Sequence, residues 1–208
     1  MLSELKNLIK ENQNILAVSK LQPINKIINL YNQGQTHFGE NYIQEALAKI
    51  ESLKDLNIKW HLIGPIQSNK IRYLNSSFEY LHSVDSLRTA KLINDHCIKK
   101  NYIQKIFIQI NIANEDSKSG FTKENFILNW SELVSMKNIN IIGLMCMPPL
   151  KNNENQLQIY FSEMKLLAAK YNLNELSMGT SADFKIALQE GSTWIRIGTA
   201  LFGERTKS

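Results

Sequence analysis

The sequence of 208 residues has only two cysteines, Cys97 and Cys146, and they form no Cys-x-x-Cys pair. Neither a disulfide framework nor a zinc site is therefore indicated, and the four histidines also lack the spacing of metal ligands. No apolar run approaches the roughly 18 residues of a membrane helix. Glu4 and Lys6 interrupt the first segment, which resembles an amphipathic helix more than a signal peptide. We expect a cytoplasmic protein with no bound metal and no membrane span.

Clustered basic residues and domain linkers are also missing. The net charge is +5, but the lysines are spread along amphipathic segments rather than gathered among aromatic residues. Such spreading is typical of a solvated surface, so we expect no binding to nucleic acid. No low-complexity or Pro/Gly-rich stretch divides the chain, and 43% of its residues are hydrophobic. A chain of this size can bury one core, which predicts a single domain over residues 1–208.

Short apolar runs alternate with helical patterns along the whole sequence. The predicted strands are 14–19, 36–38, 58–63, 79–84, 105–111, 140–145, 175–177 and 193–197. The predicted helices between them are 24–33, 42–53, 67–74, 86–100, 122–136, 153–171 and 182–190. Strict alternation implies parallel strands, and eight units fit a closed (β/α)8 barrel of the TIM type. A doubly wound open sheet would use the same pattern, but no strand leads into a Gly-x-Gly-x-x-Gly turn, so the barrel is favoured.

Lys20 ends the apolar run that begins at Ile15 and is followed at once by a turn at Pro23. A charge at the end of a core strand is costly to bury unless it has a use. Desolvation lowers the pKa of a lysine and makes its amine a nucleophile toward aldehydes. The alternative is a lysine that extends to water from the strand end.

Two segments of small residues follow the last two predicted strands, where barrels commonly bind phosphate. The first, 177–183, is predicted to be a loop that opens a helix, with hydroxyls and N–H groups available to an anion. An ordinary helix N-cap would give the same pattern. The second begins at Arg196 and includes Gly198, where the backbone can approach a ligand closely. The alternative for Arg196 is a buried salt bridge.

Lys20, the two small-residue segments and Arg196 are together consistent with one ligand, an aldehyde that carries a phosphate and a ring nitrogen. Lys20 would form an imine with the aldehyde, and the two loops would hold the phosphate. Arg196 would meet the ring nitrogen, a role that Asp or Arg fills in proteins. The ligand predicted in this way is pyridoxal 5′-phosphate.

The sequence strongly resembles the pyridoxal phosphate homeostasis protein family along nearly its whole length. The matching segments are AVSK at 17–20, FGENYIQEA at 38–46, WHLIGPIQSNK at 60–70, HSVDS at 82–86, INIANEDSKSGF at 110–121, GLMCMPP at 143–149, SMGTSADF at 177–184 and RIGTALFGER at 196–205. The resemblance implies the barrel of alanine racemases and fold-type III pyridoxal phosphate binding.

The resemblance also implies roles for particular residues. Lys20 is similar to the Schiff-base lysine and Arg196 to the partner of the pyridine nitrogen. Ser181, Gly198 and Thr199 are similar to the phosphate contacts. Asn41 lies in a matched motif and is expected at the barrel mouth. The family usually has a methionine where Thr180 stands here, and Lys118 is a candidate second amine whose alternative is a solvated loop lysine.

Whether the chain catalyses a reaction depends on a second base. Related racemases place one base on each face of the substrate, and the second is a tyrosine from a further β-domain contributed across a dimer. The sequence ends at Ser208, soon after Thr199, so we expect that domain to be absent. We therefore expect a non-enzymatic, monomeric carrier that releases pyridoxal phosphate to apo-enzymes. The alternatives are an amino-acid racemase or lyase and a sugar-phosphate Schiff-base aldolase.

Overall fold

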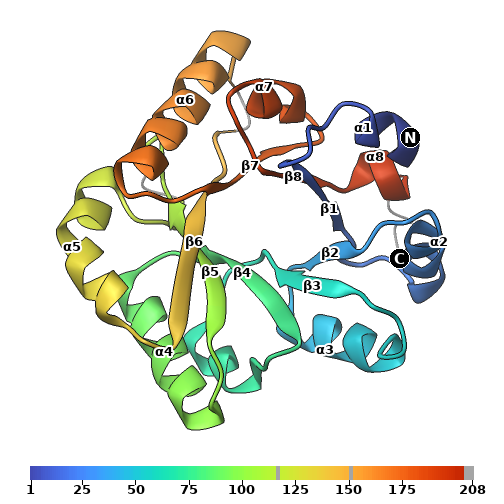
Figure 1. Ribbon diagram of the computed structural model, residues 1–208, viewed down its shortest axis with the longest axis horizontal. Coiled ribbons are helices and arrows are strands. Elements are labelled where there is room, and N and C mark those ends of the chain that lie inside the picture. Colours follow the sequence, from blue (N-terminus) through green and yellow to red (C-terminus); the bar gives the residue numbers. More distant parts are fainter. Residues whose placement is uncertain (116–117, 150–151, 204–208) are drawn as a thin grey trace.

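The computed structural model describes residues 1–115, 118–149 and 152–203. Eight parallel strands close into a barrel in the order β1 to β8, and the helices form a ring around it (Figure 1). The strands are β1 Asn14–Val18, β2 His37–Glu40, β3 Lys59–Leu62, β4 Phe78–Val84, β5 Gln104–Ile110, β6 Ile139–Cys146, β7 Glu175–Thr180 and β8 Trp194–Ile197. The helices are α1 Leu2–Lys6, α2 Ile24–Asn32, α3 Ile43–Ser52, α4 Leu87–Lys100, α5 Lys123–Ser135, α6 Glu154–Lys170, α7 Phe184–Gln189 and α8 Thr199–Phe202, with a 3₁₀ helix η1 at Ser68–Tyr73.

The predicted (β/α)8 barrel is confirmed. Strand β8 pairs with β1 in parallel, from Asn14 beside Trp194 to Ala17 beside Ile197, and this pairing excludes the open doubly wound sheet. The segment predicted as helix at 67–74 is a 3₁₀ helix. Parts of the predicted domain 1–208 and of two matched motifs, namely residues 116–117, 150–151 and 204–208, lie outside the described residues.

Polar caps fix where several helices begin. Ser86 Oγ accepts a hydrogen bond from the Thr89 N–H at the start of α4. Thr122 caps α5 and Asn153 caps α6 in the same way. Each cap satisfies an N–H group that has no partner inside the helix, so these residues set the strand-to-helix turns that surround the barrel mouth.

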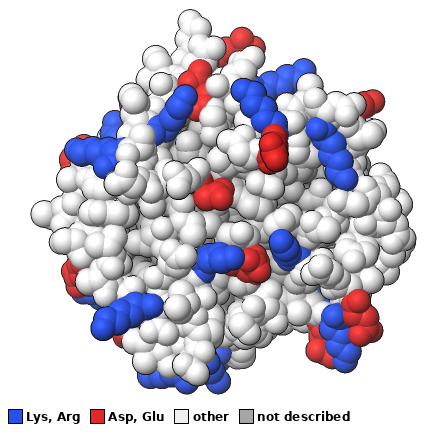
Figure 2. All heavy atoms as spheres, viewed as in Figure 1, with Lys and Arg blue, Asp and Glu red and all other residues white. Residues whose placement is uncertain are grey.

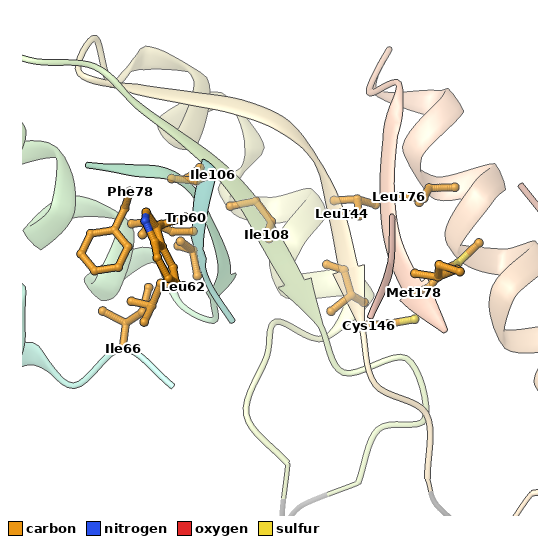
Figure 3. Packing of buried hydrophobic residues seen from close by; sticks show 14 of the residues in the cluster. Trp60, Leu62, Ile66, Phe78, Ile106, Ile108, Leu144, Cys146, Leu176 and Met178 are labelled. Atoms are coloured by element: carbon orange, nitrogen blue, oxygen red, sulfur yellow. The ribbon is translucent and has the colours of Figure 1, made fainter. Parts of the chain in front are cut away.

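The main hydrophobic core lies between the barrel and its helices. Alternate strand residues point outward into it, and Figure 3 shows Ile106 and Ile108 of β5 beside Leu144 and Cys146 of β6. A second, smaller cluster fills the barrel interior and consists of Leu16, Phe107, Met145 and Trp194. The period-two alternation of the strands separates the two clusters.

Charged side chains of both signs are distributed over the surface (Figure 2). Lysines and arginines alternate with acidic residues over the face in Figure 2, without a continuous basic patch. Both cysteines are buried and free. Within residues 1–115, 118–149 and 152–203, no cluster of three or more His, Cys, Asp or Glu side chains is arranged to hold a metal ion. In the same ranges, no helix is long and apolar enough to cross a membrane.

Candidate functional site

All six residues predicted for the site line one cavity of about 320 Å³ at the C-terminal ends of the strands. A cavity of this volume suits a small ligand. The elements that end there bring together residues far apart in the sequence. The predicted residues are Lys20, Asn41, Ser181, Arg196, Gly198 and Thr199, and they share the lining with Val18, Ile63, Met147, Thr180 and Ala182.

Lys20 lies two residues beyond the end of β1 and is half-buried. The following residue, Leu21, has a φ of 59° in the left-handed region, which is unusual for a residue with a side chain. The Leu21 N–H donates to Glu45 Oε1 over 2.6 Å. The turn that carries Lys20 is therefore held in a strained conformation by a contact from α3.

A buried ion-pair cluster holds the other side of this turn. Lys49 Nζ donates to the Ser19 carbonyl at 2.7 Å, to Glu40 Oε1 at 2.8 Å and to Glu45 Oε1 at 2.7 Å. Ser19 Oγ also donates to Glu40 Oε1 at 2.5 Å. Burial raises the pKa of Glu40, which is fully buried, while the hydrogen bonds from Lys49 and Ser19 oppose that rise. The cluster fixes the backbone on both sides of Lys20.

This cluster was not predicted from the sequence. Lys49 stands four residues after Glu45, a spacing that is typical of an exposed pair on a helix surface. Only the burial of Lys49 against β1 and β2 shows that it supports the turn of Lys20. No sequence signal separates the two situations.

Arg196 is a buried guanidinium surrounded by neutral acceptors, and it is only 6% exposed. Its Nη1 donates to the Ser177 carbonyl and to Ser177 Oγ, each at 2.7 Å, and its Nη2 donates to the Cys146 carbonyl at 2.9 Å. None of the ion pairs among the described residues includes Arg196, so the predicted alternative of a buried salt bridge is wrong. Burial lowers the pKa of Arg196, yet an arginine stays protonated. Three of its five N–H groups are used by these bonds, which leaves donors for a ligand in the cavity.

The two small-residue segments meet in the wall of the cavity. The Gly198 N–H donates to Ser181 Oγ at 3.4 Å, which places a backbone donor and a hydroxyl side by side. A Cβ on Gly198 would lie 3.6 Å from its nearest neighbour, Val18 Cβ, so packing within the protein does not demand glycine there. Space beside a backbone N–H suits the close approach of an anion.

One part of the predicted loop 177–183 belongs to a strand. Strand β7 continues to Thr180, and Ser177 points into the barrel, where it contacts Arg196 rather than the cavity. The sequence predicted a strand over 175–177 only, three residues shorter than β7. Gly179 has a φ of 92°, and a Cβ there would lie 2.6 Å from Ala187 Cβ, so glycine permits the close packing of α7.

A second cavity of about 320 Å³ adjoins the first and shares Asn41, Ile63 and Met147 with it. Lys118 lines this second cavity, and its Nζ lies 2.7 Å from Glu115 Oε1 and 3.2 Å from the Met147 carbonyl. Of the lysines that the structure describes, Lys20 lines the first of these two cavities with Ser181 and Arg196, and Lys118 lines the second in an ion pair with Glu115. Among the lysines that the structure describes, Lys20 is the one that shares a cavity with Arg196.

The described residues fit a phosphorylated aldehyde with an aromatic ring nitrogen. Lys20 offers an amine, Ser181 and Gly198 offer donors to an anion, and Arg196 offers donors to a neutral acceptor such as a ring nitrogen. The apolar side chains of Val18, Ile63 and Met147 suit the faces of a ring. An amine, donors for an anion and donors for a ring nitrogen thus lie within one cavity of suitable size.

Comparison with protein families and curated proteins gives consistent matches. The profile of the alanine racemase N-terminal domain matches residues 2–206. The chain is 39% identical over 197 residues to the pyridoxal phosphate homeostasis protein of Aquifex aeolicus (strain VF5), a match that covers 92% of this chain and 86% of the relative. It is 40% identical over 198 residues to the protein of the same name in Synechocystis sp., with 92% and 91% covered.

Solved structures agree with the fold. PipY of Synechococcus elongatus PCC7942 without PLP superposes with a TM-score of 0.94 at 36% identity, covering 97% of this chain and 98% of that chain. PipY with PLP bound gives a TM-score of 0.91 at 35% identity, with the same coverage. An alanine racemase of Clostridium difficile 630 in complex with cycloserine gives 0.80 at 16% identity, and the match covers all of this chain but 59% of that one, which shows the fold alone.

Proposed function

We propose that this chain, which belongs to the alanine racemase N-terminal domain family and to the pyridoxal phosphate homeostasis proteins within it, binds pyridoxal 5′-phosphate and serves its intracellular homeostasis. The observation that carries the proposal is the convergence of Lys20, Ser181 and Arg196 on one cavity. The PLP-bound structure of the relative PipY supports it.

When bound, pyridoxal phosphate supplies an aldehyde that condenses with an amine, a phosphate anion and an aromatic ring nitrogen. In the proposal, Lys20 is the amine and is presented by a turn that Lys49 and Glu45 hold rigid. Ser181, Gly198 and Thr199 bind the phosphate, and Asn41 borders the ring. Arg196 donates a hydrogen bond to the ring nitrogen, which stays unprotonated, because a guanidinium cannot accept a hydrogen bond and does not transfer its own proton.

The lining of the cavity favours a carrier over an enzyme. Among the described residues that line it, Lys20 and Arg196 are the only ionisable side chains. Racemisation needs a proton acceptor on each face of the substrate, and Arg196 cannot accept a proton. We therefore propose that the protein holds the cofactor without turnover and delivers it to apo-enzymes.

The test is a direct comparison of transfer and turnover. The purified protein loaded with pyridoxal phosphate is expected to activate an apo-form of a pyridoxal phosphate enzyme and to leave L- and D-alanine unracemised. The optical rotation of alanine and the activity regained by the acceptor are measured in parallel. Multiple-turnover racemisation would replace the carrier by the racemase alternative, and failure to retain the cofactor through gel filtration would reject both.

Ser181→Ala is expected to weaken binding of pyridoxal 5′-phosphate by roughly 10- to 100-fold and to leave binding of pyridoxal unchanged. A hydrogen bond to a charged group contributes about 1.5–3 kcal/mol, and pyridoxal lacks the phosphate. Isothermal titration with both ligands gives the two affinities. Ser119→Ala is the matched control, because Ser119 is an exposed serine in the adjoining cavity. Equal losses for the two ligands would remove Ser181 from the phosphate site.

We extend the proposal to a monomeric state, to one functional domain over residues 1–208 and to the cytoplasm. All six site residues come from one copy of the chain, so the site needs no second copy. The two free, buried thiols suit a reducing compartment. Light scattering of the purified protein at micromolar concentration checks the monomer.

A further inference from the structure

A chain of polar side chains crosses the interior of the barrel. His37 Nδ1 lies 2.8 Å from His61 Nε2, and His61 Nδ1 lies 2.9 Å from His82 Nε2. His82 Nδ1 lies 2.8 Å from Ser177 Oγ, which accepts a bond from Arg196 Nη1 at 2.7 Å. We call these five residues the histidine column. It links the start of β2 to the guanidinium in the proposed cofactor cavity.

The column lies among aromatic rings rather than among the branched aliphatic residues common inside such barrels. The His82 ring stacks on Phe107 with 4.3 Å between centroids, and the His61 ring stacks on Tyr80 at 4.6 Å. His61, His82 and Ser177 are fully buried. These contacts fix the ring planes of His61 and His82, and in this arrangement both nitrogens of each of the two rings find a partner.

Arg196 sets the direction of every hydrogen bond in the column. A guanidinium only donates, so Ser177 Oγ accepts from Arg196. Among the described residues, His82 Nδ1 is the one remaining partner of this hydroxyl, which therefore donates to it. His82 then carries its proton on Nε2 and donates to His61 Nδ1, and His61 in turn donates from Nε2 to His37 Nδ1.

The neutral state of the histidines agrees with this arrangement. Burial lowers the pKa of His61 and of His82 well below the usual value, and the nearby Arg196 charge lowers that of His82 further. A positive charge on His82 would turn Nδ1 into a donor, and the Ser177 hydroxyl proton would then have no acceptor among its described partners. The column therefore works as a set of neutral, oriented dipoles beside a buried cation.

We propose that His82 is a positioning residue for Arg196, acting through Ser177, and that His61 and His37 hold His82 in its Nε2–H tautomer. The orientation of Ser177 keeps an acceptor directed at Nη1 of Arg196. The guanidinium plane is thereby fixed, and its remaining N–H groups keep one direction in the cavity. The effect on a bound ring nitrogen rests on the proposed function, whereas the tautomers do not.

The first test uses the wild-type protein without ligand. Protein labelled with ¹⁵N at histidine is examined by long-range ¹H–¹⁵N NMR at pH 7, with His37, His61 and His82 assigned by single substitutions. We expect three neutral imidazoles, each protonated at Nε2. An Nδ1–H tautomer at His82, or signals averaged between tautomers, would overturn the proposal whether or not pyridoxal phosphate binds.

The second test breaks the column at its hydroxyl. Ser177→Ala is expected to release His82 from the single tautomer and to shift the absorption maximum of bound pyridoxal phosphate. Ser177→Thr, which keeps the hydroxyl, should restore both. Ser192→Ala is the matched control, since Ser192 is a fully buried serine bonded to the Met178 carbonyl outside the column. An unshifted absorption maximum in Ser177→Ala, or the same shift in Ser192→Ala, would reject a positioning role.

Discussion

Lys20→Ala is expected to abolish the visible absorption band of the bound cofactor and its capture by borohydride. The band requires a covalent bond between the aldehyde and an amine, and Lys20 is the amine that shares a cavity with Arg196 and Ser181. The phosphate contacts remain in this variant, so pyridoxal phosphate should still bind, more weakly. Absorption spectra, with mass spectrometry after borohydride reduction, measure the covalent bond, and titration calorimetry measures the residual affinity.

The matched control is Lys118→Ala. Lys118 lines the adjoining cavity and lies in an ion pair with Glu115. Its substitution should leave the band intact. A band that survives in Lys20→Ala and disappears only in the double variant would assign the covalent bond to Lys118. A band that survives in Lys20→Ala and also in the double variant would show that neither lysine forms the covalent bond.

Acidification from pH 6.5 to about 4 is expected to destabilise the fold strongly. His37, His61 and His82 have pKa values lowered by burial, that of His37 to about 4. In this range the unfolded chain binds protons at these histidines, whose usual pKa is 6.5, while the folded chain does not. The free energy of unfolding therefore falls as the pH falls, by about 1.4 kcal/mol per pH unit for each such histidine.

Glu40 acts in the opposite direction. Burial raises its pKa, so just above pH 4.5 the folded chain binds this proton more tightly than the unfolded chain does. The single carboxyl of Glu40 offsets the contribution of at most one of the three histidines. The free energy of unfolding therefore still rises as the pH rises. Urea unfolding followed by circular dichroism between pH 7 and 5 gives the slope.

His37→Gln provides the control for this slope. The variant removes one of the three titrating groups at the half-buried end of the column, so its slope should be smaller by about 1.4 kcal/mol per pH unit. A free energy of unfolding that stays level between pH 6.5 and 5 in the wild type would show that these histidines are protonated in the folded state.

Local pattern predicted the fold well, because strand and helix periodicities are properties of neighbouring residues. Every predicted strand is present, and most boundaries differ by one or two residues. The largest error was in β7, where Gly179 and Thr180 resemble a loop but continue the strand to Thr180. Their pairing with β8, where Thr180 lies beside Arg196, comes from tertiary contact that no local pattern contains.

The grouping of the six proposed site residues around one cavity could be predicted from the sequence, but the residues that support them could not. Lys20, Ser181 and Arg196 stand at strand ends, and a barrel brings all strand ends to one face, so order along the sequence was sufficient to group them. Lys49 and Glu45 support Lys20 from a neighbouring helix, and their spacing resembles a surface pair. Their role depends on burial, which the sequence does not display.

By itself, the sequence determined the eightfold alternation, the residues at the barrel mouth and the family, because each is written in local order and motif. Only the tertiary structure decided the surroundings of the charges. It placed neutral acceptors around Arg196 instead of a carboxylate, and it aligned three histidines from β2, β3 and β4 behind it. Whether a buried charge meets a carboxylate, a carbonyl or a ring is set by the register between strands, since a shift of one residue would turn each of these side chains to the other side of the barrel wall.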